Sequence, residues 1–81
     1  MCGIVGYCNS SVTSKDLRTL KQVLIESKIR GLHASGIAWY NGKELLHIIE
    51  PIAMDKLLKD FDLNTLVYNH KISMIAHTRY S

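Results

Sequence analysis

The dipeptide Asn41-Gly42 lies between two β-prone runs, residues 35–40 and 43–50. An Asn-Gly pair in this setting is the strongest short-range signal for a β-hairpin, because a type I′ turn needs positive φ at both central residues. The pattern predicts two antiparallel strands joined by this tight turn. Pro51 has no amide hydrogen to donate to a neighbouring strand, so the second strand is expected to end before it.

Apolar runs on either side of the hairpin predict further strands. Residues 2–8 form a short β-prone run, and residues 72–77 form another near the end of the sequence. Cys8 lies within the first run and is expected to be buried there as a small apolar residue. Residues 64–70 are ambiguous between helix and strand.

Two helices are predicted between these strands. Thr13 and Asp16 have the spacing of a capping box, in which each side chain accepts a hydrogen bond from the other residue's amide at a helix start. The leucines that follow recur on one face, which indicates an amphipathic helix over about residues 14–29. Residues 53–61 predict a second, shorter helix. The order strand, helix, hairpin, helix, strand indicates an α+β fold with an antiparallel sheet and packed helices. It lacks the parallel series and the glycine-rich loop of a nucleotide-binding fold.

The composition fits one small domain over residues 1–81, with 47% hydrophobic residues and a net charge of +3. No Lys/Arg cluster with interleaved aromatic residues is present, so we expect no nucleic-acid partner. No apolar run approaches the length of a membrane span and no signal peptide is evident, so we expect a cytoplasmic protein without a membrane partner. The two cysteines and four histidines lie at no recognised ligand spacing. We therefore expect neither a metal nor another cofactor.

Cys2 stands directly behind the initiator methionine. A small second residue permits removal of Met1, which leaves Cys2 with a free α-amine, a group whose ordinary pKa is roughly 7.7–8.0. That amine can act as a general base toward its own thiol, so that one residue supplies both nucleophile and base. A thiolate suits attack on a carboxamide because it forms a thioester that water can open. On position alone, a buried apolar role for Cys2 stays open, and with Met1 retained its nitrogen is an amide that cannot serve as base.

Two other stretches carry residues with chemical potential. In residues 29–39, Gly31 and Gly36 bracket a short segment before a strand, where glycine permits positive φ or a close backbone approach. A helix end followed by a strand-entry turn explains these glycines equally well. In residues 76–81, Arg79 follows an apolar strand, and a guanidinium there suits a bidentate grip on a carboxylate. An ordinary surface arginine is the alternative.

Three stretches taken together resemble the class II glutamine amidotransferases, whose glutaminase domain belongs to the N-terminal-nucleophile hydrolases. Residues 2–4 resemble the Cys-Gly-Ile with which the family opens after its initiator methionine. Residues 30–37 resemble its Arg-Gly-x-x-x-Ser/Ala-Gly-Ile element, and residues 76–81 resemble its Gly/Ala-His-x-Arg-Tyr/Trp-Ser/Ala segment. The resemblance implies the leading part of a glutamine amidotransferase type-2 domain, and hence of an N-terminal-nucleophile (Ntn) hydrolase αββα sandwich.

Carried over residue by residue, the resemblance implies that Cys2 attacks the side-chain amide of L-glutamine, with its own amine as the proton shuttle. Arg79 is implied to hold the α-carboxylate of glutamine. Thr78 and Tyr80 are implied to flank the same pocket. The resemblance assigns supporting roles to three further residues, namely Arg30, Gly31 and His77.

The resemblance further implies that the released ammonia passes to a downstream synthase domain or subunit. The family's Asn-Gly oxyanion-hole pair and the Asp that holds the substrate amine lie outside residues 1–81, so we expect a truncated domain that is inactive alone. Such a part is expected to leave sheet edges and an apolar face open, which another copy of the chain can cover. Two other functions stay open, namely hydrolysis of a different amide and a non-catalytic binding or assembly module.

Overall fold

The computed structural model describes residues 2–27 and 33–79, with Cys2 in its backbone only. Within these residues the chain forms one five-stranded sheet together with α-helices and a short 3-10 helix. The elements in chain order are β1 (Cys2–Asn9), α1 (Ser14–Glu26), β2 (Ala34–Tyr40), β3 (Leu45–Glu50), α2 (Met54–Asp60), the 3-10 helix η2 (Leu63–Leu66), β4 (Val67–Tyr68) and β5 (Lys71–Arg79). The α+β fold expected from the sequence is confirmed, and each predicted strand and helix is present.

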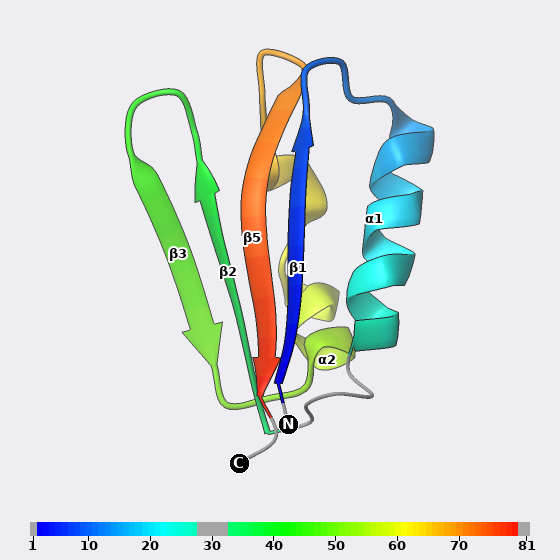
Figure 1. Ribbon diagram of the computed structural model, residues 1–81, viewed down its shortest axis with the longest axis vertical. Coiled ribbons are helices and arrows are strands. Elements are labelled where there is room, and N and C mark those ends of the chain that lie inside the picture. The colour runs from blue at the N-terminus through cyan, green and yellow to red at the C-terminus, as the bar shows by residue number, and fades with distance from the viewer. Residues whose placement is uncertain (1, 28–32, 80–81) are drawn as a thin grey trace.

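The strand pairings of the described chain are all antiparallel, and the path across the sheet is β1-β5-β2-β3. The short β4 pairs with the beginning of β5. The first and the last strand of the chain therefore lie side by side (Figure 1). Because β5 also pairs with β2, it joins the N-terminal strand to the β2–β3 hairpin.

Helices α1 and α2 cover one face of the sheet (Figure 1). The side chains of β5 alternate accordingly, since Met74 and Ala76 are buried whereas Ile75 and His77 are exposed. Successive side chains of a strand point to opposite faces, so the buried set faces the helices. It packs there against residues such as Leu24 of α1, which is fully buried.

The opposite face of the sheet carries no helix of the described chain. We call it the open face. It consists of the alternate β5 residues Lys71, Ser73, Ile75, His77 and Arg79 together with the residues of the other strands that share their side of the sheet. Its large apolar side chains are strongly exposed, with 74% for Ile4, 73% for Leu45, 62% for Ile49 and 54% for Ile75. The apolar face that the sequence predicted to be open is thus present in the described part of the chain.

The start of α1 is fixed by the predicted capping box. The Asp16 amide donates to the Thr13 hydroxyl at 3.2 Å, and the Thr13 amide donates to the Asp16 carboxylate at 2.8 Å. The hydrogen bond from the Thr13 backbone lowers the pKa of the Asp16 carboxyl, because it favours the charged form. The reciprocal pair confirms that Thr13 precedes the first helical residue.

The predicted β2–β3 hairpin is present, but its predicted turn is wrong. Residues 41–44 form a longer loop in which the side-chain oxygen of Asn41 accepts hydrogen bonds at 2.9 Å from the amides of Lys43 and Glu44. Of these four loop residues, only Gly42 has a positive φ, of 96°. A Cβ on Gly42 would lie 2.2 Å from the Tyr68 ring, so glycine is required there by both backbone conformation and space. Hydrogen bonds to the Asn41 side chain thus hold this loop, instead of the type I′ backbone turn that the Asn-Gly dipeptide predicted.

A tight turn with positive φ at two successive residues occurs instead at Asn69 and His70, with φ of 49° and 61°. It joins β4 to β5, whose residues Tyr68 and Lys71 are direct partners. These are the φ signs of a type I′ turn. The ambiguous residues 64–70 thus contain the end of a 3-10 helix, a short strand and a hairpin turn. The sequence pattern missed this turn because neither residue is glycine.

The prediction that Cys8 is buried is wrong. Cys8 is exposed and is a free thiol. It is the partner of Ser73, and both lie on the open face, so the alternation of the strand turns Cys8 away from the helices. Among the described residues, no helix is long and apolar enough to cross a membrane.

Candidate functional site

The sheet brings the three sequence motifs to one end. Cys2, the first residue of β1, is the direct partner of Arg79, the last residue of β5. Ala34, the first residue of β2, is the partner of Arg79 on its other side. The amide of His33, within the second motif, donates to the carbonyl oxygen of Arg79 at 3.0 Å. Segments separated by most of the chain thus meet at the end of the sheet where β5 terminates.

The pairing of Cys2 with Arg79 fixes the distance between the backbones of these two residues. Directly opposed residues of antiparallel strands have Cα atoms roughly 4.5–5.5 Å apart. A small amino-acid substrate whose carboxylate is held by a guanidinium can therefore reach the neighbouring strand with its own side chain. The register places a candidate nucleophile and a candidate carboxylate-binding residue at adjacent positions.

Arg79 is exposed and occupies the open face, on the same side of β5 as His77. Its guanidinium therefore extends from the side of the sheet that the helices do not cover. A planar guanidinium presents paired N–H donors that match the two oxygens of a carboxylate. The position is compatible with the role of Arg79 that the resemblance implies.

Thr78 lies on the other face of β5 and is only 1% exposed. Its hydroxyl donates to the carbonyl oxygen of Ser27 at 3.0 Å and so ties β5 to the end of α1. Its partner Ser35 is also buried and donates to the carbonyl oxygen of Ile52 at 2.8 Å. The structure does not bring the Thr78 side chain to the side chain of Arg79. Strand alternation is the signal that separates these adjacent residues.

His77 lies on the open face directly beside Gly36. A Cβ added to Gly36 would lie 2.8 Å from Nε2 of His77, which is too close for an ordinary contact. Gly36 thus makes room for the imidazole, a close approach that the absence of a side chain permits. In the structure, the His77 imidazole packs across β2 at Gly36 rather than at the end of the sheet where Arg79 lies.

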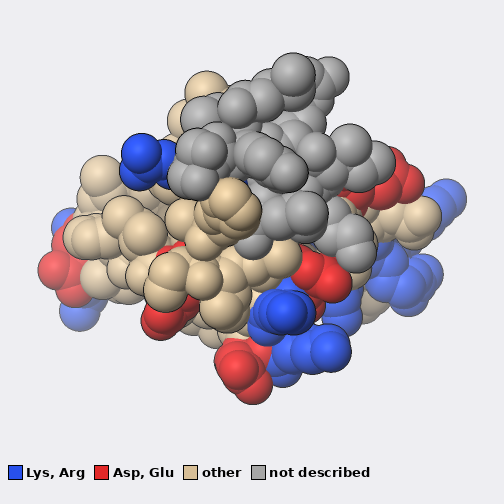
Figure 2. Space-filling view, turned by 90° about the horizontal axis from the view of Figure 1, so that it is seen from below, with Lys and Arg blue, Asp and Glu red and all other residues tan. Residues whose placement is uncertain are grey.

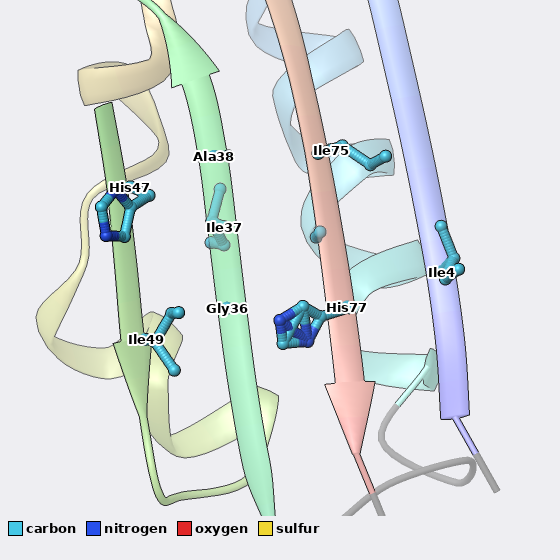
Figure 3. Close-up of a pocket in the computed structure, with 9 residues that line it drawn as sticks. Ile4, Gly36, Ile37, Ala38, His47, Ile49, Ile75 and His77 are labelled. Carbon is cyan, nitrogen blue, oxygen red and sulfur yellow. The ribbon is translucent and has the colours of Figure 1, made fainter. Parts of the chain in front are cut away.

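The open face is hollowed over β2, as Figure 3 shows. The hollow has a volume of about 270 Å³ and an apolar lining to which two imidazoles contribute. The lining residues are Ile4, Gly36, Ile37, Ala38, His47, Ile49, Ile75, Ala76 and His77. Sequence reasoning missed His47, because nothing in its surroundings marks it apart from the alternation of β3.

Several residues of the predicted site lie outside the described residues. These are Met1, Arg30, Gly31 and Tyr80, together with the side chain of Cys2. The roles that the resemblance implies for them stay predictions. What the structure supplies is the backbone register that joins Cys2 and Arg79 and the placement of Thr78, His77 and Gly36 around it.

Basic and acidic side chains are mixed around the end of the molecule that Figure 2 views. On the described part of this surface no broad region carries a single sign of charge.

Comparison with protein families, with curated proteins and with solved structures finds no match for this chain. Within residues 2–27 and 33–79, no group of three or more His, Cys, Asp or Glu residues is placed to hold a metal ion. The functional argument therefore depends on the motifs and on the geometry that joins them.

Proposed function

We propose that this chain is the nucleophile-bearing part of a glutamine amidotransferase, acting within a longer protein. The observation that carries the proposal is the direct pairing of Cys2 with Arg79 across β1 and β5. Two motifs that the resemblance assigns to the nucleophile and to the substrate carboxylate become neighbours through a register that neither motif determines alone. The third motif, residues 30–37, enters the sheet beside them at Ala34.

The proposed reaction begins once Met1 has been removed. The free amine of Cys2 takes the proton of its thiol, and the sulfur attacks the side-chain amide carbon of L-glutamine while Arg79 holds the α-carboxylate. The protonated amine then gives its proton to the leaving nitrogen, which departs as ammonia and leaves a thioester. Water attacks the thioester and releases glutamate. The resemblance assigns the oxyanion donors to residues outside 1–81, so we propose that this chain has no glutaminase activity alone.

The one-sided arrangement of the fold supports the finer architecture that we propose. The described chain has one layer of helices and one antiparallel sheet, an arrangement that is compatible with two of the four layers of an αββα sandwich. The exposed isoleucines of the open face are suited to contact a second sheet, because facing sheets bury the inward side chains of both. We further propose that the ammonia goes to a synthase domain or subunit and that the protein is cytoplasmic.

A second candidate is a non-catalytic assembly module of the same fold. The observation that favours it is the gathering of strongly exposed apolar side chains on the open face, because contiguous exposed apolar patches mark interaction sites. In this case Met1 would be retained and the nitrogen of Cys2 would be an ordinary amide.

The proposal is tested by measuring glutamate and ammonia release from L-glutamine by the full-length protein, after mass spectrometry shows that Met1 is absent. We expect hydrolysis of L-glutamine and little hydrolysis of L-asparagine, whose shorter side chain places the amide out of reach when Arg79 holds the carboxylate. Equal hydrolysis of both would indicate an amide hydrolase of other specificity. No hydrolysis together with retention of Met1 would favour the assembly module.

A further inference from the structure

The open face has a trough with ridges on both sides. At the bottom of the trough, β2 contributes the small residues Ala34, Gly36 and Ala38, which are the partners of Arg79, His77 and Ile75. The half-exposed Tyr40 follows on the same side at the end of β2. One ridge is formed by Ile75 and His77 of β5, and the other by His47 and Ile49 of β3 (Figure 3). The hollow described above is the middle of this trough.

We infer that a second copy of the chain packs face to face on the open face, with the β5 ridge of each copy in the β2 trough of the other. The trough and the ridge lie on adjacent strands, β2 and β5. A two-fold axis that runs between these strands and parallel to them places β2 of each copy opposite β5 of its partner. The same surface then serves both copies, as an isologous contact requires. The inference does not rest on the proposed function and concerns the 81-residue chain, because in a longer protein with the proposed αββα sandwich the second sheet would take the place of the second copy on this face.

The size of the open face is compatible with a stable pair. Four strands spaced by about 4.8 Å, with roughly seven residues each, give a projected area of roughly 450 Å² on each copy. Because the side chains project unevenly from the sheet, two facing copies bury more surface than this projected area. The total approaches the lower limit of about 1,000–1,200 Å² for specific protein interfaces. Ile4, Ile49 and Ile75 are more than half exposed and supply the apolar centre.

The charged groups of the open face are placed at its ends. Lys71 and Arg79 are the first and last positions of this side of β5, where long side chains can reach water past the rim of a contact. No Asp or Glu of the described strands shares a side with Ile75 in the sheet, and both cations lie at the ends, so the centre of this face carries no Asp, Glu, Lys or Arg for a charged partner to pair with. An apolar, self-complementary partner fits it better.

The inference is tested by sedimentation equilibrium of the 81-residue chain from micromolar to millimolar concentration. At about pH 7.5 we expect a species of twice the 9.2 kDa chain mass. Ile75→Glu places a charge on the ridge and should raise the dissociation constant by about 100-fold. The matched control is Val23→Glu, because Val23 is 42% exposed on α1 and lies on the helical side, so its dissociation constant should not change.

Circular dichroism of both variants establishes that they are folded, which is expected because each replaced side chain is exposed. A monomer throughout the concentration range would overturn the inference. So would equal weakening of the dimer by the two variants. Because Cys2→Ala leaves the open face intact, its dimerisation should be normal, and failure of the dimer can be distinguished from failure of the proposed catalysis.

Discussion

Replacing Cys2 with alanine is expected to lower glutamine hydrolysis by the full-length protein at least about 10³-fold, because it removes the atom that forms the thioester. The proposed general base is the α-amine of the same residue, and it survives the substitution without a thiol to activate. The loss should appear in kcat, since the residue acts on the reacting bond. The measurement is glutamate release at saturating L-glutamine, with the absence of Met1 verified by mass spectrometry in both proteins.

The matched control is Cys8→Ala. Cys8 is a free and exposed thiol on the same strand, but its nitrogen is part of a peptide bond and its partner is Ser73 rather than Arg79. We expect kcat to remain within about twofold of the parent protein, because surface substitutions away from a site have small effects. Retained turnover in Cys2→Ala would rule out Cys2 as the nucleophile. Loss of turnover in Cys8→Ala alone would transfer that role to Cys8.

Replacing Arg79 with alanine is expected to raise the KM for L-glutamine about 100-fold. A bidentate contact between guanidinium and carboxylate contributes about 3 kcal/mol at most, which corresponds to roughly that factor in affinity. The carboxylate remains bound throughout the reaction, so the interaction affects substrate and transition state alike and kcat should change less than KM. Initial rates across a range of glutamine concentrations separate the two parameters.

Two further variants make this result specific. Lys71→Ala removes the cation at the opposite end of the same side of β5 and should leave KM unchanged. Arg79→Lys retains the charge but loses the paired donors, so its KM should fall between those of the parent and Arg79→Ala. An unchanged KM in Arg79→Ala, or an equal increase in Lys71→Ala, would contradict the assignment of the carboxylate to Arg79.

Local features of the fold were predictable because each depends on residues close together in the sequence. The capping box at Thr13 and Asp16 fixes the start of α1 through hydrogen bonds across three residues. The apolar runs and the Asn41-Gly42 signal located the hairpin strands within one or two residues. The turn itself was not predictable from the dipeptide, because the side chain of Asn41 satisfies two backbone amides and leaves positive φ to Gly42 alone.

The faces of the strands were less predictable. Cys8 was expected in the core and is exposed, whereas Thr78 was expected beside Arg79 and is buried on the opposite face. Composition gives no information on which side of a strand a residue takes. Which face of the sheet is buried is determined by where α1 and α2 pack. A shift of the strand pairing by one residue would move every side chain of that strand to the opposite face.

The candidate site was predictable as a set of motifs but not as a geometry. The sequence marks Cys2, the segment around Gly36 and Arg79, which are separated by large parts of the chain. Their meeting depends on the position of β5 between β1 and β2, and pairing between strands distant in sequence is a property of the whole sheet. The space that Gly36 leaves for the His77 ring follows from the same register.

The most direct test of Cys2 as an N-terminal nucleophile is covalent labelling of the full-length protein. The probe is a glutamine analogue that carries a chloromethyl ketone in place of the side-chain amide, and the readout is intact and peptide mass spectrometry. We predict one adduct, on Cys2, only in molecules without Met1, and slower labelling in excess L-glutamine. Retention of Met1 in every molecule, or labelling of Cys8 at the same rate as Cys2, would contradict the account.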